Sequence, residues 1–205
     1  MNFLWEEDDF WSKVLNILLA TALIFLATQT AGGMALAATV GKAEDDRARY
    51  GRVMNMYWNY KKSFPKVEDL PAEEALGLWR GGEAVFVDVR EAREQAVSTI
   101  PGAVRHRDFI KDLDSFKGRT VIVYCTISFR SGRLARRLSR KGIRVINLQG
   151  GLLAWLHAGG PVHRDGNPVN RVHVYGRKWN LAPLAVEAVW KDYQLGHPSD
   201  MTDAP

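Results

Sequence analysis

Apolar and polar positions along the middle of the chain follow two different periods. The run Val121-Ile-Val-Tyr124 is short and uniformly apolar, which is typical of a buried strand. Segment 131–141 instead repeats apolar residues at helical spacing. The same alternation predicts strands at 84–89, 103–105, 120–124 and 145–148, and helices at 69–80, 91–95, 107–116, 131–141 and 152–158. Short apolar strands alternating with helices predict an α/β fold, in which a parallel sheet carries helices on both faces.

The N-terminal segment is apolar over a length that can span a membrane. No charged residue occurs between Lys13 and Lys42, and about 20 residues suffice to cross a bilayer as a helix. A cleaved signal peptide is the alternative, with the small residues at 35–37 as the cleavage site. The acidic residues at 6–9 differ from the basic start of signal peptides, so the pattern favours a retained transmembrane helix.

The basic residues that flank this segment predict its orientation. Only Lys13 precedes it. The basic residues that follow it are Lys42, Arg47, Arg49, Arg52, Lys61 and Lys62. Because positive charge is retained on the cytoplasmic side, we expect a single-pass membrane protein with its globular part in the cytoplasm. Signal cleavage would instead export that part.

Four parts of the chain differ in pattern. They are the apolar segment at 1–41, a juxtamembrane helix and linker at 42–66, the α/β domain at 67–162, and an extension with a tail at 163–205. The helix predicted at 42–62 ends at Ser63-Phe-Pro65, because proline cannot continue a helix. No role follows from the sequence of 163–194.

The single cysteine stands where a parallel sheet presents its functional groups. Cys125 follows the strand at 120–124, and a helix rich in arginine begins a few residues later. Backbone N–H groups and the positive end of the helix dipole favour a thiolate at such a position. Arg130 adds a fixed positive charge, so the pattern predicts a nucleophile in an anion-binding loop. A second thiol is absent from the chain, so any sulfur held on Cys125 must leave to an outside acceptor.

The composition of the chain indicates a cluster of basic residues. The chain has 205 residues, a formal net charge of +5 and a pI near 9.4. Much of the excess charge lies in Arg130, Arg133, Arg136, Arg137, Arg140, Lys141 and Arg144. A solvated helix face explains this cluster better than a nucleic-acid site, so we expect no nucleic acid as partner. The five histidines lack metal-ligand spacing, and no metal site is expected.

Four further segments follow one another in a fixed order. They are Val85–Glu91, Ile100–Ala103, Val123–Ser131 and Asn147–Trp155. Together they resemble the single-domain rhodaneses, over about residues 67–162. The resemblance implies a rhodanese-like parallel sheet and sulfurtransferase activity, here in a form with an N-terminal membrane helix.

The resemblance also implies a double displacement at the cysteine. Cys125 would take the outer sulfur of a donor such as thiosulfate, and the resulting persulfide would pass it to a thiol, cyanide or an acceptor protein. Arg130 would attract the anionic donor, while Asp88 and Arg90 would support the loop by charge-assisted hydrogen bonds. The backbone N–H groups that surround the persulfide would belong to the substrate-binding residues Thr126, Ile127, Ser128, Phe129 and Ser131. No metal or organic cofactor is implied, because the protein itself carries the sulfur.

Two features of the loop qualify this picture. Many rhodanese loops have glycine three residues after the cysteine, where this chain has Ser128, so the serine either strains the turn or adds a hydroxyl donor. Related phosphatases place five residues between cysteine and arginine, whereas Thr126–Phe129 are only four. The shorter loop favours a sulfur atom over a phosphate.

A second hypothesis stays open: a rhodanese fold that serves as a binding or assembly subunit of a membrane complex, with weak catalysis or none.

Overall fold

The computed structural model describes residues 39–190, and the chain forms two compact units, Met1–Glu44 and Asp45–Pro205. Residues 39–44 of the first unit are helical. The transmembrane helix predicted within 14–41 lies outside the described residues except for its last three positions, and the tail at 191–205 lies outside them too. Over residues 39–190, no helix combines the length and the apolar character needed to cross a bilayer.

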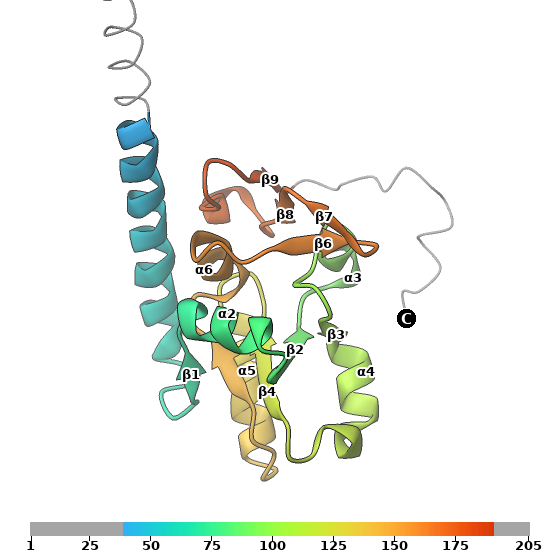
Figure 1. Cartoon of the computed structure of the whole chain (residues 1–205). Helices are drawn as coiled ribbons and strands as arrows, with labels where there is room; N and C mark the ends of the chain where they lie inside the picture. Colours follow the sequence, from blue (N-terminus) through green and yellow to red (C-terminus); the bar gives the residue numbers. More distant parts are fainter. Residues whose placement is uncertain (1–38, 191–205) are drawn as a thin grey trace, which may run out of the picture. The chain divides into compact units, whose positions relative to one another are not determined.

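The second unit opens with a helix over residues 45–61. A five-stranded sheet with flanking helices follows it. Its elements are β1 (Asp69–Leu70), α2 (Ala72–Arg80), β2 (Ala84–Asp88), α3 (Ala92–Gln95), β3 (Val104–Arg105), α4 (His106–Lys111), η1 (Leu113–Phe116), β4 (Thr120–Tyr124), α5 (Phe129–Ser139), β5 (Ile146–Leu148) and α6 (Gly151–His157). The strand order is β1-β5-β4-β2-β3, and every pair is parallel (Figure 1). The predicted α/β fold is therefore confirmed.

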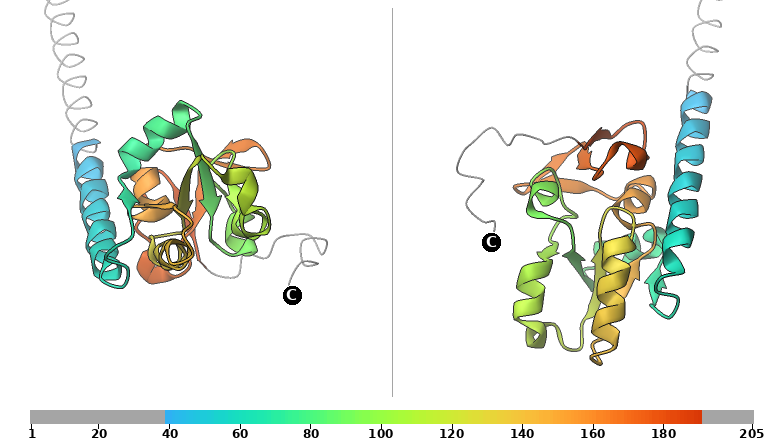
Figure 2. Two further views of the ribbon diagram at one scale, coloured as in Figure 1. Left: turned by 90° about the horizontal axis from the view of Figure 1, so that it is seen from below. Right: turned by 180° about the vertical axis from the view of Figure 1, so that it is seen from behind.

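The alternation of side chains along the strands separates two hydrophobic layers. Phe86 and Ile122 belong to the cluster under α2 and α6, which is centred on the fully buried Trp155. Val87 and Val123 belong to the other cluster, which also contains residues of α4 and α5. The two views of Figure 2 show α4 and α5 together on one side of the sheet. Because both faces are covered, the central strands β2 and β4 have uninterrupted apolar positions rather than an alternation with polar residues.

Three parts of the described chain differ from the sequence prediction. Asp69–Leu70 is the edge strand β1 and not the start of a helix, which begins at Ala72. The helix predicted at 107–116 is interrupted at Asp112, whose φ of −136° leaves the α region and whose side chain accepts from Ser115 N. The unassigned extension forms β6 (Val162–Arg164), β7 (Asn167–Val169), β8 (Arg171–His173), η2 (Arg177–Trp179) and β9 (Glu187–Val189).

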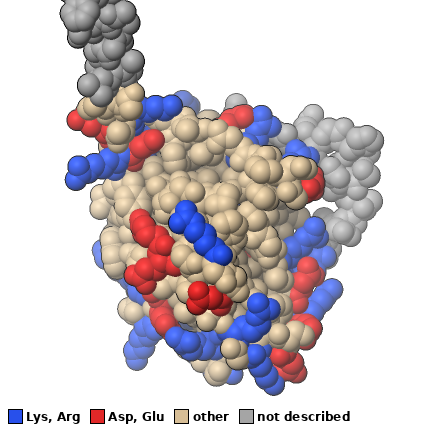
Figure 3. All heavy atoms as spheres, viewed as in Figure 1, with Lys and Arg blue, Asp and Glu red and all other residues tan. Residues whose placement is uncertain are grey.

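Several arginines of the predicted basic cluster are exposed. The exposed arginines of α5 are Arg133, Arg136 and Arg137, and Arg140 directly after the helix is exposed too. Another face, shown in Figure 3, carries acidic and basic side chains next to one another. Arg144 of the basic cluster is paired with Glu68 at 2.8 Å, and Arg136 donates to the Ser63 carbonyl at 2.6 Å. These contacts fit a solvated basic helix face.

Candidate functional site

Cys125 lies directly after β4, at the carboxyl end of the central strand of the sheet. Its side chain is buried, and the residue is 2% exposed. The sulfur has a polar neighbour, since Ser131 Oγ lies 3.7 Å from Cys125 Sγ. The parallel sheet therefore brings the thiol to the edge where ligands of such folds bind.

The loop after Cys125 makes a left-handed turn at Ser128. This residue has a φ of 74° and precedes the first turn of α5. Its hydroxyl donates to the Leu148 carbonyl, which fixes the turn against the end of β5. The first bond of α5 runs from Gly132 N to Ser128 O, so helix geometry leaves the N–H groups of residues 129–131 without partners inside the helix. Such N–H groups are suited to bind an anion.

The first turn of α6 holds the other side of this loop. Leu152 N donates to Cys125 O at 2.8 Å, and Leu153 N donates to Thr126 O at 3.1 Å. This close approach requires glycine at 151, because a Cβ there would lie 2.5 Å from Cys125 O and 2.8 Å from Ile127 N. Gly151 also has a φ of 61°, which favours glycine independently.

Arg130 is held in a bidentate ion pair that the sequence did not predict. Its Nη1 and Nη2 donate to Glu94 at 2.5 and 2.7 Å, and Nη2 also donates to Thr126 Oγ1 at 3.2 Å. The Arg130 side chain is 28% exposed, whereas Glu94 is fully buried. Burial alone would raise the pKa of Glu94, but the hydrogen bonds and charge of Arg130 hold it below its ordinary value. Both partners are therefore charged near neutral pH.

The remaining loop residues have different surroundings. Ile127 is buried in the cluster under α6, and the Phe129 ring packs on Tyr60 with centroids 5.1 Å apart. Their side chains therefore contribute to packing, and only their backbone N–H groups remain as candidates for binding. Thr126 and Ser131 contribute hydroxyl groups to the site, one to Glu94 at 3.2 Å and one near the sulfur.

Asp88 and Arg90 form a buried ion pair beside the loop. Arg90 Nη2 donates to Asp88 Oδ2 at 2.6 Å and to the Ser98 carbonyl at 2.5 Å. Asp88 also accepts from the Tyr124 hydroxyl at 2.8 Å. These hydrogen bonds fix the segment after β2 and the end of β4, rather than bonding directly to residues 126–131 as we expected. The pair therefore supports the loop through Tyr124, the residue before the cysteine.

The C-terminal extension also reaches the site, which the sequence did not indicate. The Tyr175 ring lies over the Arg130 guanidinium, 5.1 Å from its carbon to the ring centroid, and Tyr175 is 46% exposed. His173 is buried, and its Nδ1 accepts from Tyr175 N at 3.0 Å. Burial lowers the pKa of His173, Arg90, Arg93 and Arg130 lower it further, and Glu94 opposes them. These residues lie far from the cysteine in sequence, and no spacing motif connects them.

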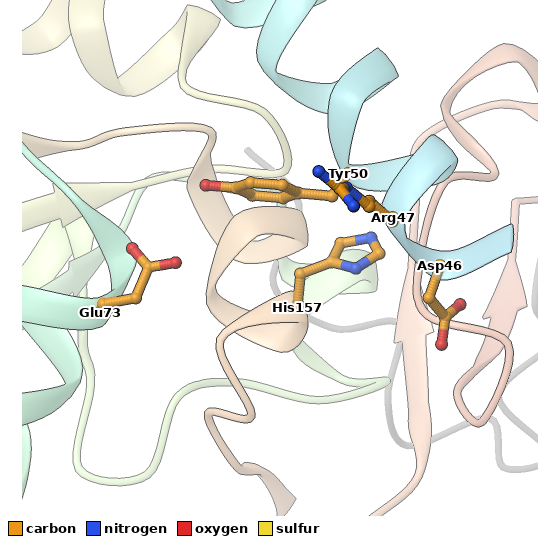
Figure 4. Close-up of a pocket in the computed structure, with 5 residues that line it drawn as sticks. All are labelled: Asp46, Arg47, Tyr50, Glu73 and His157. Atoms are coloured by element: carbon orange, nitrogen blue, oxygen red, sulfur yellow. The ribbon is translucent and has the colours of Figure 1, made fainter. Parts of the chain in front are cut away.

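A separate groove of about 230 Å³ lies away from the Cys125 loop. Figure 4 shows its lining residues, which come from the helix at 45–61, α2 and α6. They are Asp46, Arg47, Tyr50, Glu73 and His157. Burial and the Glu73 carboxylate raise the pKa of Tyr50. None of these residues belongs to the loop, so the groove contributes no group to the sulfur site.

Comparison with known proteins identifies relatives of this chain. The Rhodanese-like domain family matches residues 71–158. An uncharacterized protein of Synechocystis is 37% identical over 101 residues, 47% of this chain and 56% of that protein. A protein named Sulfurtransferase from Allochromatium vinosum is 34% identical over 84 residues, 39% of this chain and 78% of that protein. A solved structure from Rhodopseudomonas palustris, described as a protein of unknown function and possible tyrosine phosphatase, has 25% identity and a TM-score of 0.44, covering 54% of this chain and 93% of that one.

The aligned region spans just over half the length of the Synechocystis relative and more than three quarters of the Allochromatium sulfurtransferase. The family match at 71–158 includes the strands from β2 to β5, the Cys125 loop and the Arg130 position described above. The chain therefore belongs to the rhodanese family, and one of its relatives is named Sulfurtransferase.

Proposed function

We propose that the chain transfers sulfane sulfur from an anionic donor such as thiosulfate to a thiol or cyanide acceptor. The observation that carries this proposal is the position of Cys125 directly after β4, at the start of a loop that leads into α5 and has Arg130 in the first turn of that helix. Sulfur transfer needs a thiolate nucleophile and a place for negative charge on the outer sulfur, and this loop offers both.

The reaction proceeds in two displacements. The Cys125 thiolate attacks the outer sulfur of thiosulfate, the S–S bond of the donor breaks, and sulfite leaves with the bonding electron pair. The outer sulfur of the new persulfide is anionic and accepts hydrogen bonds from the free N–H groups at the start of α5. An acceptor thiolate or cyanide then attacks this sulfur, and Cys125 returns as the thiolate.

Arg130 is already paired with Glu94, and this pairing affects how an anionic donor binds. An incoming anion must share or displace the Glu94 carboxylate, so this ion pair limits how tightly a small donor binds. Burial by itself would lower the pKa of Arg130, but Glu94 and the nearby sulfur raise it, so the guanidinium stays charged throughout. Its charge then stabilises the leaving sulfite as well as the persulfide.

The test is a thiosulfate:cyanide sulfurtransferase assay on the full chain, with Cys125→Ser as the matched control. We expect thiocyanate formation by the wild type alone, and an intact mass increased by one sulfur atom after treatment with donor. Because Cys125 is the only cysteine, that added mass locates the persulfide. If neither protein forms thiocyanate with any of several donors, the proposal is contradicted.

We also propose a membrane-anchored form with the rhodanese domain in the cytoplasm, in which the acceptor is a thiol or a protein partner. Support comes from the uncharged stretch between Lys13 and Lys42 and from the basic residues after it. Fractionation with alkaline extraction tests the anchor, and intact mass of the native chain tests signal cleavage. A mature chain that begins after Ala37 would favour export.

Two observations favour the alternative, a weakly catalytic module of a membrane complex. Cys125 is nearly inaccessible, and Arg130 is already in contact with both Tyr175 and Glu94. In that case persulfide formation would be slow with every donor, and the Cys125→Ser variant would still assemble with its partner.

A further inference from the structure

Hydrogen bonds connect the Cys125 sulfur to an ion pair at the edge of the sheet. Ser131 Oγ lies 3.7 Å from Cys125 Sγ and 2.7 Å from Asn147 Oδ1. Asn147 Nδ2 donates to Asp69 Oδ1 at 2.5 Å. The other carboxylate oxygen of Asp69 pairs with the Lys61 ammonium. Ser131, Asn147 and Asp69 are called the relay below.

The register of the sheet explains why these residues meet. In the parallel pair of β1 and β5, Asp69 lies beside Asn147, and Asn147 lies beside Val123 of β4. Val123 faces the layer that contains α5, so neighbouring side chains at this level face α5 as well. Ser131, in the first turn of α5, completes the chain. Ser131 and Asn147 are both fully buried, so water does not compete for these bonds.

The ion pair fixes the direction of every bond in the relay. A carboxylate paired with an ammonium only accepts hydrogen bonds, so the Asn147 amide must turn its Nδ2 toward Asp69. Asn147 Oδ1 then faces Ser131. The hydroxyl of Ser131 has one proton, and the amide oxygen at 2.7 Å is a closer and stronger acceptor than the sulfur at 3.7 Å. Ser131 Oγ therefore presents a lone pair to Cys125.

We propose that the relay stabilises the protonated thiol of Cys125, and that Asn147 and Asp69 are positioning residues that set the direction in which Ser131 bonds. This inference rests on the proposed function only in taking Cys125 as the atom that carries sulfur. A lone pair aimed at the sulfur favours S–H over S⁻, because hydrogen bonding to the neutral form disfavours the charged form. The relay therefore opposes the free N–H groups and Arg130, which favour the thiolate.

Other charged groups surround the loop. Arg130 of α5 follows Cys125 by five residues, and Glu94 of α3 neutralises much of its charge. Burial lowers the pKa of His173 of β8, and Glu94 opposes that shift while Arg90 and Arg93 add to it. On the side of the relay, Lys61 pairs with Asp69. Burial and the same Asp69 carboxylate raise the pKa of Tyr57, so this phenol stays neutral.

The experiment measures the rate of alkylation of the full chain by iodoacetamide between about pH 5 and pH 10. Cys125 is the only cysteine, so the midpoint of the rate profile reports its titration alone. For Ser131→Ala we expect the midpoint to move down by about half to one pH unit, and alkylation below the midpoint to become about three- to tenfold faster. An upward shift would show that Ser131 donates to the thiolate, and an unchanged midpoint would show that it does not couple. Either result overturns the proposal.

Asp69→Asn tests the positioning role. An amide at 69 no longer fixes the orientation of Asn147, so Ser131 becomes free to donate to the sulfur and the midpoint moves down. The same substitution made together with Ser131→Ala should add no further shift. Equal shifts in both backgrounds would overturn the relay. Asp114→Asn, which removes an exposed carboxylate paired with Lys117, is the matched control and should leave the midpoint unchanged.

Thermal unfolding of each variant verifies that it is folded. If Asp69→Asn does not fold, the direction of the Ser131→Ala shift still decides the proposal. Sulfur transfer is measured in parallel. If the midpoints shift as expected but no sulfur is transferred, the proposed function is contradicted and the relay is supported. If sulfur transfer is normal but the midpoints do not shift, the relay is contradicted.

Discussion

Ser128 combines backbone strain with a compensating hydrogen bond. A φ of 74° places a non-glycine residue in the left-handed region, which costs on the order of 1 kcal/mol. The bond from its hydroxyl to the Leu148 carbonyl satisfies a group at the end of β5. The comparison with glycine at this position predicted either strain or an added donor, and the structure contains both.

Substitutions at Ser128 separate these two contributions. Ser128→Ala keeps the strained φ and leaves a buried carbonyl without its donor, so we expect a loss of about 1–3 kcal/mol in the free energy of unfolding. Ser128→Gly loses the same bond but relieves the strain, so it should be more stable than the alanine variant by about 1 kcal/mol. Urea unfolding measures both. A glycine variant less stable than the alanine variant would show that the turn is unstrained.

Glu94 makes the stability of the fold depend on acid. Its folded pKa lies below the ordinary value of 4.5, so the unfolded state binds more protons as the pH falls. The stabilisation by the Glu94–Arg130 pair is therefore fully present above about pH 4.5 and is lost as the pH falls through the folded pKa. We expect Glu94→Gln to lower the free energy of unfolding by about 2 kcal/mol at pH 7, and the difference from wild type to shrink toward pH 3.

Glu68→Gln is the matched control for this prediction. Glu68 forms an equally bidentate pair with Arg144, at 3.0 and 2.8 Å, but both side chains are exposed. Exposed pairs contribute about 0–1 kcal/mol, so its loss should change little. Equal losses in the two variants would mean that burial adds nothing to the Glu94 pair.

At the residue scale, the sequence indicates groups near the cysteine and misses distant ones. Cys125, Arg130 and Ser131 stand within one short segment, and their types and spacing indicate an anion-binding nucleophile. Glu94 looks like an ordinary capping residue of a short helix, a role that it also has through Glu91 N. Tyr175 belongs to a segment without periodicity, so only the tertiary fold brings it to Arg130.

At the scale of elements, the contact between α6 and the loop depends on Gly151. We expect Gly151→Ala to destabilise the protein by more than about 2 kcal/mol and to reduce sulfur transfer, because its Cβ would collide with the backbone of Cys125, Ile127 and Ser128. Gly159→Ala is the matched control. Gly159 has a similar φ of 78°, but nothing lies within 4 Å of the added Cβ.

The two glycine variants share the cost of a left-handed alanine, about 1 kcal/mol. The excess loss in Gly151→Ala, measured by urea unfolding, is therefore due to crowding of the loop. If both variants lose the same free energy of unfolding and both retain sulfur transfer, the loop can shift to make room for a side chain at residue 151.

Element prediction succeeded where one period dominates a long enough segment. The strand predicted at 120–124 coincides with β4, and the helix at 131–141 overlaps α5, because apolar runs and helical spacing are unambiguous there. The helix at 107–116 was predicted as continuous because its composition does not reveal the bond from Ser115 N to the Asp112 side chain. The strands of the extension have three residues each, which is too short for a period to appear.

At the scale of the molecule, the helix at 45–61 holds the segment that follows Tyr175. Arg49 Nη1 donates to the carbonyls of Asn180 and Ala182, each at 3.2 Å, and Asp46 Oδ1 accepts from Leu184 N at 2.7 Å. These bonds connect residues more than 130 positions apart within one unit. The segment that follows Tyr175, whose ring lies over Arg130, is thus held by a helix from the other end of the domain.

Arg49→Ala should loosen the segment that follows Tyr175. We expect a loss of about 1–2 kcal/mol in the free energy of unfolding, together with faster limited proteolysis between residues 176 and 186. The exposed Arg52, one turn along the same helix, provides the control Arg52→Ala. Cleavage at the same rate in both variants would show that Arg49 does not anchor the segment.

The sheet ends on both sides in strands of only two residues, β1 and β3. Their brevity leaves few unpaired N–H and C=O groups at either margin, and Lys61 places a charged group against β1. A foreign strand needs a longer run of free backbone to add itself there. We therefore expect fibre growth by edge-to-edge pairing to be disfavoured at β1 and β3.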